Sequence, residues 1–495
     1  MQMPQPDREV LANRASFVAE LRRLVAADNV IADEAGLRTF ECDGLSAYRS
    51  LPLAVALPET TAEVARILEL CAANKVKVVP RGSGTGLSGG ALPLQDGIVL
   101  GLGKFNRILE IDYANRAAVV QPGVTNLAIS HAVEAAGFYY APDPSSQIAC
   151  SIGGNVAENS GGVHCLKYGV TTNNLLGLEI VLMNGDVVRL GGKHFDADGY
   201  DLMGIVTGSE GLLGVITEVT VRLLARPPSA KALLIGFADI TDAGRCVADI
   251  IAAGIIPAGL EMMDRACVHA AEEFCHAGYP LDVDALLICE LDGPEAEVDE
   301  LAERVGAIAE ACKATSLKRS ASEAERQRFW LGRKSAFPAV GRMSPDYYCM
   351  DGTIPRGKLA YVLARMAELS EKFGLGIVNV FHAGDGNLHP LIMYDAAKTG
   401  DLERAEGLGA EILKLCVEVG GVLSGEHGIG VEKRDLMGTM FSDDDLDQQQ
   451  RIKCAFDPDG LLNPGKLFPV LHRCAELGRM HVHHGELPFP DLPRF

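Results

Sequence analysis

The hydrophobic residues in the first half of the chain follow two periods, which predicts helices alternating with short strands. Residues 61–73 repeat apolar side chains at three- and four-residue intervals, with Glu63 in the first turn. This pattern predicts a helix capped by Thr60 or Thr61. Short runs rich in Val, Ile and Leu predict strands, and they lie at residues 75–79, 98–102, 117–121, 178–183, 187–190 and 215–224.

The pattern changes after Arg226-Pro227-Pro228, where we expect a domain boundary. Strands predicted at 232–238 and 286–291 alternate with helices at 243–253 and 294–314. A hairpin further along the chain joins them. The second half is therefore expected to form a sheet with helices on one face, and the predicted fold class is α+β.

Composition and charge narrow the class of protein. A chain of 495 residues exceeds what one core usually supports, so two or three domains are expected. The net charge of −21 disfavours nucleic acid or an anionic membrane surface as a partner. Thirteen cysteines without C-x-x-C spacing indicate reduced thiols and no iron–sulfur motif.

No targeting or membrane segment is predicted. Residues 15–27 mix Glu20, Arg22 and Arg23 into an amphipathic pattern that is unlike a signal peptide. No apolar run approaches the 18 or so residues of a membrane span. We therefore expect a cytoplasmic protein with no transmembrane segment.

Two histidines flank a predicted hairpin turn. Apolar runs at 377–381 and 391–394 enclose Asp385-Gly386, a dipeptide that type I′ turns favour. With that dipeptide at the centre, His382 pairs with His389, and opposite residues share one face of a hairpin. Two such imidazoles could bind one metal ion. Half-buried, hydrogen-bonded histidines are the alternative.

A glycine-rich loop at residues 80–90 follows a predicted strand. It contains a nominal G-x-G-x-x-G at Gly84, Gly86 and Gly89, but a Rossmann fold needs a helix to begin there. The following residues 91–97 are too short and contain Pro93. The exposed backbone N–H groups still suit phosphate oxygens, and a surface turn is the alternative.

Two further clusters of small residues lie at 150–162 and 208–214. Glycine recurs where the backbone must approach another group closely. Three clusters in one domain predict a long ligand such as a dinucleotide, while three unrelated tight turns remain the alternative.

Several motifs resemble a known flavoprotein family. PRGSGTGLSGG, CSIGGNVAENSGG and TGSEGLLGVITEVTVRL resemble, in order, the FAD-binding domain of the vanillyl-alcohol oxidase family. HAGDGNLH and SGEHGIG resemble its D-2-hydroxyacid dehydrogenases, and ECDGLSAYRS, FPAVGRMSPDYYCMDGTIP and MHVHHGELPFP its glycolate oxidase branch. The resemblance implies an FAD-binding domain at 1–228, an antiparallel-sheet α+β substrate or cap domain with a metal site at 229–430, and a helical segment and tail at 431–495 that return to the FAD domain.

The resemblance also implies the residues that bind FAD. The first loop lacks the histidine that attaches FAD covalently in some relatives, so a non-covalent flavin is expected. The implied cofactor-binding residues are Arg81, Gly82, Ser83, Gly84, Thr85, Gly86 and Ser88 at the phosphates, Asp143, Ser151, Gly154 and Gly161 along the cofactor, and Ile216 at the adenine end.

Glu426 and His427 stand together between glycines. Glu426 could complete a site with His382 and His389 that leaves positions open for a substrate, or it could be a surface acid at a helix entry. The resemblance implies the metal site, with His427 as base and Arg333 as the group that binds the substrate carboxylate. Zinc, manganese and iron all accept such ligands. Lys334 is expected to be solvated.

The resemblance implies a reaction as well. A 2-hydroxyacid would bind the metal, lose its hydroxyl proton to His427 and pass a hydride to FAD. Relatives that oxidise D-2-hydroxyglutarate carry polar residues where this chain has Phe337, Cys349 and Leu391. We therefore predict a small monocarboxylate, glycolate or also D-lactate. A stand-alone D-lactate or D-2-hydroxyglutarate dehydrogenase is the alternative.

Two other classes of protein remain open at this stage. A metal-dependent hydrolase would use the same histidines and glutamate but would leave the glycine clusters without a ligand. A non-catalytic subunit would lack the metal ligands. The resemblance implies iron–sulfur and second flavoprotein-like subunits as partners, with the chain peripheral to the inner membrane through them. Six other histidines are expected to be structural or exposed: His131, His164, His194, His481, His483 and His484.

Overall fold

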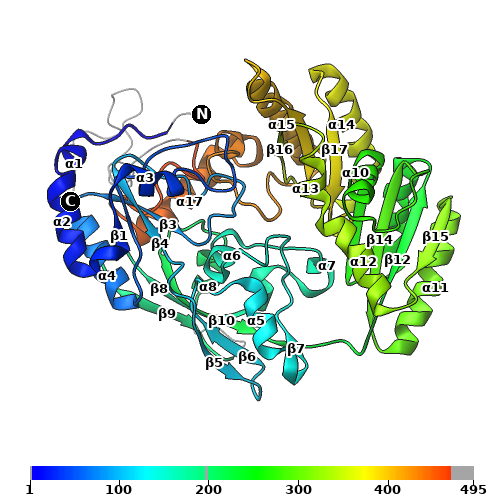
Figure 1. The fold of residues 1–495 in the computed structure, drawn as a ribbon, viewed down its shortest axis with the longest axis horizontal. Helices are drawn as coiled ribbons and strands as arrows, with labels where there is room; N and C mark the ends of the chain where they lie inside the picture. Colours follow the sequence, from blue (N-terminus) through cyan, green and yellow to red (C-terminus); the bar gives the residue numbers. More distant parts are fainter. Residues whose placement is uncertain (1–2, 195–198, 470–495) are drawn as a thin grey trace, which may run out of the picture.

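The computed structural model describes residues 3–194 and 199–469. Figure 1 shows two bodies, one built from the first half of the chain and from its last helices, the other from the middle. The prediction for His481, His483 and His484 concerns residues outside the described part, as does the rest of the tail. No helix in the described part is long and apolar enough to cross a membrane.

The first body contains two main sheets, and its best-predicted element is α4. That helix spans Thr61–Ala73, and the Thr60 side chain accepts a hydrogen bond from the Glu63 N–H, as predicted. The other helices are α1 (Arg8–Ala12), α2 (Arg14–Leu24), α3 (Glu34–Leu37), α5 (Asn126–Val133), α6 (Ile152–Glu158), α7 (Cys165–Tyr168) and α8 (Leu202–Val206).

The smaller sheet of this body has the strand order β1-β2-β4-β3, and β4 pairs in parallel with both of its neighbours, β2 and β3. The larger sheet is antiparallel and runs β5-β6-β10-β8-β9. The strands are β1 (Val30–Ile31), β2 (Ala54–Ala56), β3 (Lys77–Arg81), β4 (Gly97–Gly101), β5 (Ile108–Asp112), β6 (Ala117–Val120), β8 (Leu175–Val181), β9 (Val187–Gly191) and β10 (Val215–Arg222), with β7 (Phe138–Tyr139) pairing β11 (Leu224–Ala225) separately.

The second body is built on one antiparallel sheet in the order β15-β12-β14-β13-β17-β18-β16. Its strands are β12 (Ser229–Phe237), β13 (Gly259–Asp264), β14 (Ala285–Gly293), β15 (Ser316–Arg319), β16 (Asp346–Cys349), β17 (Ile377–Phe381) and β18 (Pro390–Tyr394). Its helices are α9 (Ile240–Ala252), α10 (Arg265–Cys275), α11 (Glu295–Ala311), α12 (Glu323–Lys334), α13 (Ala336–Val340), α14 (Leu359–Phe373) and α15 (Asp401–Glu418).

Helices cover both faces of this sheet, so the prediction of helices on one face was wrong. Leu287 and Cys289 of β14 pack in a core with α9, α11, α14 and α15. Leu286 and Ile288 pack in a separate core with α10, α12 and α13. The nearly continuous apolar run of β14 is the physical reason, because a strand covered on both faces needs apolar side chains on both.

The histidine hairpin has a longer turn than predicted. Pairs such as Asn379↔Pro390 set a register that continues to a bridge between His382 and Asn387, so His389 is not directly opposite His382. The Gly386 N–H donates to the His382 carbonyl, and the Gly384 N–H donates to the carbonyl of Leu260 on β13. The turn between His382 and Asn387 is therefore four residues long, and the second of these bonds docks it on β13. His389 lies diagonally across from His382.

The last described segment returns to the first body. After α16 (Met437–Met440) and α17 (Asp443–Phe456), the Asn463 N–H donates to the carbonyl of Val78 on β3. The Asn463 side chain also donates to the carbonyls of Gly90 and Glu210. These bonds hold the segment around Asn463 against two of the glycine clusters.

Candidate active site

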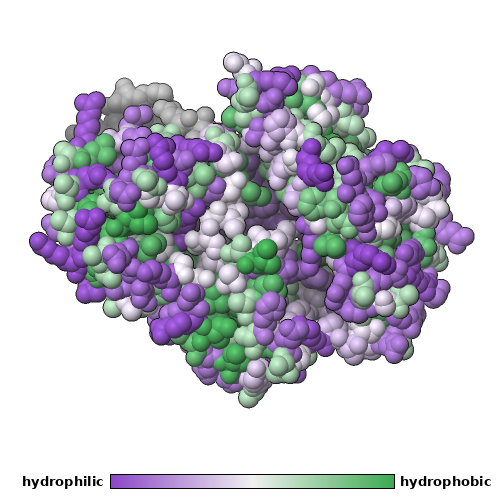
Figure 2. Space-filling model, viewed as in Figure 1, coloured by the Kyte–Doolittle hydropathy of each residue, from purple (hydrophilic) through white to green (hydrophobic). Residues whose placement is uncertain are grey.

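A cavity of about 400 Å³ lies where the two bodies meet. All three glycine clusters contribute to its wall, and His389, Glu426 and His427 lie at it as well. Figure 2 shows this face of the molecule hollowed between the two bodies. The predicted ligand loops and two of the three predicted metal ligands, His389 and Glu426, thus line one space, whereas His382 does not reach it.

The glycine loop leaves room for an extended ligand. No helix forms between β3 and β4, both within the described residues, so the Rossmann alternative does not apply. A Cβ on Gly86 would meet nothing within 4 Å, whereas one on Gly82 would lie 2.1 Å from the Ser151 hydroxyl. That hydroxyl is buried and has no hydrogen-bond partner among the described residues. An open, glycine-lined wall with an unpaired donor fits a bound dinucleotide.

Most of the predicted cofactor residues line this cavity. They are Arg81, Gly82, Ser83, Gly84, Thr85, Gly86, Ser151, Gly154 and Ile216. Ser88, Asp143 and Gly161 do not line it. The Ser88 carbonyl accepts the N–H groups of residues 431 and 432, and the Gly161 N–H donates to Glu426 Oε2 at 3.1 Å. The Asp143 carboxylate instead interacts with the His164 ring.

The predicted metal ligands converge. Glu426 Oε1 lies 3.3 Å from His382 Nε2 and 3.2 Å from His389 Nε2. Ligand atoms around a tetrahedral metal with bonds near 2.0–2.1 Å are about 3.3 Å apart. The ring centroids of the two histidines are 5.1 Å apart. The three side chains are almost fully buried, and their donor set fits a divalent metal.

Glu261 on β13 supports this group and was missed from the sequence. Its Oε1 lies 2.7 Å from His382 Nδ1, and its Oε2 accepts from Arg333 Nε at 2.7 Å. Burial alone would raise the pKa of Glu261, but His382 and Arg333 outweigh burial and lower it. A single acid within the apolar residues 259–263 was the available signal, because such an acid is seldom buried without a partner.

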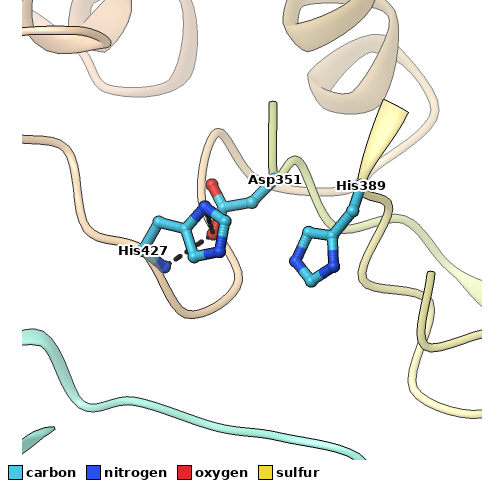
Figure 3. A group of neighbouring side chains, drawn as sticks. All are labelled: Asp351, His389 and His427. Carbon is cyan, nitrogen blue, oxygen red and sulfur yellow. Dashed lines mark hydrogen bonds and ion pairs between the residues drawn. The ribbon is translucent and has the colours of Figure 1, made fainter. Parts of the chain in front are cut away.

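His427 stands beside Asp351, a second residue that the sequence did not reveal. Figure 3 shows the His427 ring next to the Asp351 carboxylate, with His389 approaching from the other side. Asp351 Oδ2 accepts the N–H groups of residues 425, 426 and 427, and its Oδ1 accepts from Lys433 Nζ at 2.5 Å. This carboxylate anchors the loop that carries His427.

Asp351, His389 and His427 also lie close enough together to be considered as metal ligands. The rings of His389 and His427 are stacked, 4.9 Å apart and 3° from parallel. Imidazole lone pairs lie in the ring plane, so two stacked rings cannot both point at one ion. Asp351 is also already occupied by its donors. The geometry therefore favours a base, and burial lowers the pKa of His427 to about 4, which leaves it neutral near pH 7.

The two neighbouring cations near the end of α12 differ in burial. Arg333 is 1% exposed and does not line the cavity, and its Nη2 lacks a partner among the described residues. Lys334 is exposed, as expected of a solvated residue, but it also lines the cavity.

Glu210 joins the third glycine cluster to the loop of His427. Its two carboxylate oxygens accept the N–H groups of Ile429 and Gly430, each at 2.7 Å. A Cβ on Gly428 would lie 2.1 Å from Glu158 Oε2 and 3.1 Å from Glu210 Oε1, so the two acids are close neighbours. Burial and Glu210 raise the pKa of Glu158 well above its usual value.

His164 lies between the two bodies and is not the unaccompanied residue that the sequence suggested. Its Nδ1 is 2.8 Å from Asp143 Oδ2 and its Nε2 is 3.2 Å from Glu290 Oε1. Glu290 Oε2 also accepts from Arg326 Nη1 at 2.6 Å and from the Trp330 indole N–H. None of these residues lines the cavity.

Two family models match the chain. The FAD binding domain covers residues 52–191, and the C-terminal domain of FAD linked oxidases covers residues 226–467. The chain is 58% identical over 483 residues to glycolate oxidase subunit GlcD of Escherichia coli (strain K12), covering 98% of this chain and 97% of the relative. It is 34% identical over 459 residues to D-lactate dehydrogenase of Archaeoglobus fulgidus, covering 91% of this chain and 99% of the relative.

The fold is also found among solved structures. A structure of p-cresol methylhydroxylase with substrate bound superposes with a TM-score of 0.80 at 19% identity, covering 93% of this chain and 98% of the other. At that identity the likeness concerns the fold alone. It agrees with the predicted fold class of a vanillyl-alcohol-oxidase-type FAD-binding domain with an α+β cap domain.

Proposed function

The chain belongs to the FAD-linked oxidases of the vanillyl-alcohol oxidase family and is an FAD-dependent oxidoreductase; from that premise we propose that it oxidises a small D-2-hydroxymonocarboxylate, glycolate or also D-lactate, to the 2-oxoacid. Relatives named glycolate oxidase subunit and D-lactate dehydrogenase support this substrate class. Family membership removes the support for a metal-dependent hydrolase.

One observation carries the proposal: the His427 imidazole lies at the glycine-lined cavity and stacks on His389, a member of the group suited to a metal. In the proposed reaction Nε2 of His427 takes the proton from the substrate hydroxyl. Asp351 holds in place the loop that carries His427, through the backbone N–H groups of residues 425, 426 and 427. Non-covalently bound FAD supplies the redox chemistry by accepting the hydride. The proposed phosphate and cofactor contacts are the cavity residues named above.

The metal site is the second part of the proposal. His382, His389 and Glu426 would hold a divalent ion, zinc, manganese or iron. Such an ion would lower the pKa of the substrate hydroxyl. Arg333 would bind the substrate carboxylate with its unpaired Nη2, because a guanidinium is suited to planar carboxylates.

The apolar surroundings of His389 support a monocarboxylate. The Phe337 ring lies at the cavity with its centroid 6.4 Å from that of His389. Leu391 pairs with Cys349 in the sheet, and both pack in one hydrophobic core with Phe337. A second carboxylate placed there would be buried without a partner, which costs several kcal/mol, roughly 2–7 for an unpaired polar group.

The reaction can be tested by mixing purified, FAD-loaded protein anaerobically with glycolate, D-lactate or D-2-hydroxyglutarate. We expect glycolate or D-lactate to bleach the flavin absorbance, and D-2-hydroxyglutarate to do so far more slowly. Faster bleaching by D-2-hydroxyglutarate would refute the monocarboxylate pocket. A flavin that no hydroxyacid bleaches would refute the reaction and favour a non-catalytic subunit.

We also propose that the chain works within a complex. The word subunit in the name of its relatives supports partners. An iron–sulfur subunit would accept the electrons beside a second flavoprotein-like subunit, and the chain would be cytoplasmic and peripheral to the inner membrane through them. Co-expression with such an iron–sulfur subunit should give a stable complex whose clusters are reduced by glycolate, and clusters that stay oxidised would contradict this assignment.

A further inference from the structure

Glu261 occupies a position where a charge is unexpected. It lies on β13, near the middle of the seven-stranded sheet, and is 0% exposed. The neighbouring strand β17 pairs Phe381 with Met262, and continuing that register by one residue places His382 opposite Glu261. Opposite residues of an antiparallel pair project to the same face, so the strand pairing itself brings the two side chains together.

Both oxygens of Glu261 are engaged, each by a different group of the proposed site. Oε1 faces His382 Nδ1 and Oε2 faces Arg333 Nε, both at 2.7 Å. A carboxylate accepts hydrogen bonds and cannot donate them, so Nδ1 of His382 carries a proton directed at Glu261. Nε2 is then the nitrogen that would bind a metal ion beside Glu426 and His389. The same carboxylate fixes the guanidinium and leaves its Nη2 unpaired.

We propose that Glu261 is the positioning residue that couples the two substrate anchors of this site, the metal ligand His382 and the carboxylate-binding Arg333. The inference rests on the proposed function. Glu261 sets the tautomer and direction of the histidine with one oxygen and the direction of the arginine with the other. Losing it should therefore weaken metal binding and substrate binding together, although Glu261 itself does not line the cavity.

The test is Glu261→Gln in the FAD-loaded protein, with Zn²⁺ affinity measured by titration after removal of bound metal. The amide keeps the size of the side chain but offers one acceptor oxygen where the carboxylate offers two. We expect Zn²⁺ affinity to fall 10- to 100-fold, on the scale reported for such supporting partners, and KM for glycolate to rise, with FAD still bound.

Glu290→Gln is the matched control, because Glu290 is also buried and also bridges a histidine and an arginine, on the neighbouring strand β14. It should leave Zn²⁺ affinity within about twofold, as expected for a residue that supports no metal ligand. Arg333→Gln separates the effect on substrate binding from the effect on metal binding. It should raise KM for glycolate while preserving Zn²⁺ affinity. Equal Zn²⁺ affinity in wild type and Glu261→Gln would overturn the inference.

The double variant Glu261→Gln/Arg333→Gln covers the case in which the single variant does not fold, because it leaves no unpaired buried charge. It should show the same loss of Zn²⁺ affinity, and full Zn²⁺ affinity in it would overturn the inference too. Failure of the proposed function looks different. In that case wild-type protein itself would bind no Zn²⁺, or His389→Ala would turn over glycolate normally.

Discussion

His382 and His164 have nearly the same immediate surroundings. Each imidazole lies between two carboxylates, with Nδ1 at 2.7 or 2.8 Å from one and Nε2 at 3.3 or 3.2 Å from the other. In each case one of the acids also holds an arginine of α12, Arg333 or Arg326. The chain thus builds the same arrangement twice, about one strand apart in the same sheet.

The difference lies in what completes each arrangement. His389 stands next to His382 and directs Nε2 at the same carboxylate oxygen, and both His389 and Glu426 reach the cavity. The corresponding place near His164 is occupied by the Trp330 ring, and donors from Trp330 and Arg326 occupy Glu290. A second histidine and an open side therefore distinguish a centre suited to a metal from one suited to holding two bodies together.

Removing the second histidine should have the largest effect. His389→Ala should lower kcat/KM for glycolate by about 10³-fold or more, because a metal supplies several kcal/mol of stabilisation and each 1.4 kcal/mol is tenfold. Steady-state assays and the flavin spectrum would measure this, and FAD should remain bound. The paired variant His164→Ala should keep most of the activity. Similar losses in both variants would erase the distinction between the two centres.

Replacing the base should have the next largest effect. His427→Gln should lower kcat by about 10²–10⁴-fold, the usual contribution of a positioned base. Metal content and FAD content should stay at the wild-type level, because His427 is proposed to bind neither. A variant that lost its metal along with its activity would instead place His427 among the ligands, as in the group Asp351, His389 and His427.

The His164 centre should affect stability and leave the reaction largely intact. Hydrogen bonds to charged groups contribute about 1.5–3 kcal/mol each, so His164→Gln should lower the free energy of unfolding by roughly that amount. Urea denaturation of wild type and variant would measure it. An unchanged midpoint would mean that the contacts of His164 with Asp143 and Glu290 do not contribute to stability.

The pH dependence of that difference gives a sharper test. Burial would lower the pKa of His164, but Asp143 and Glu290 outweigh burial and raise it well above its usual value. A raised folded-state pKa means that the stabilisation is complete below about pH 6.5, the unfolded value. It is lost as the pH rises through the folded-state pKa. Wild type and His164→Gln should therefore converge in stability at alkaline pH and differ most near pH 6.

Lys334 should show the smallest effect. It is exposed at the cavity, where interactions between solvated charges contribute about 0.2–1 kcal/mol. Lys334→Gln should therefore raise KM for glycolate by no more than about fivefold with kcat unchanged. Arg333→Gln should raise KM considerably more. The reverse order in steady-state kinetics would make Lys334 the carboxylate-binding group.

Local signals in the sequence were sufficient for much of the fold. The helix Thr61–Ala73 and its Thr60 cap follow from spacing and one capping side chain, both contained within the segment. The convergence of His382, His389 and Glu426 was also predicted. The turn between the histidines was not, because its length depends on the bond from Gly384 to Leu260, far away in the chain.

Supporting residues were harder to predict for the same reason. Glu261 meets His382 across 121 positions, and His164 meets Glu290 across 126. A single acid in an apolar strand indicates that some partner exists, but only the strand order identifies it. The strand β13 was itself not among the predicted strands.

The most direct test of the account is anaerobic flavin bleaching by glycolate in three samples of the FAD-loaded protein: wild type stripped of metal, the same protein with Zn²⁺ or Mn²⁺ restored, and His389→Ala with the same ions. We predict that the stripped protein bleaches slowly, that a restored metal recovers fast bleaching, and that His389→Ala stays slow throughout. Fast bleaching by the stripped protein and by His389→Ala would contradict the assignment of the histidine pair to a metal that serves hydroxyacid oxidation.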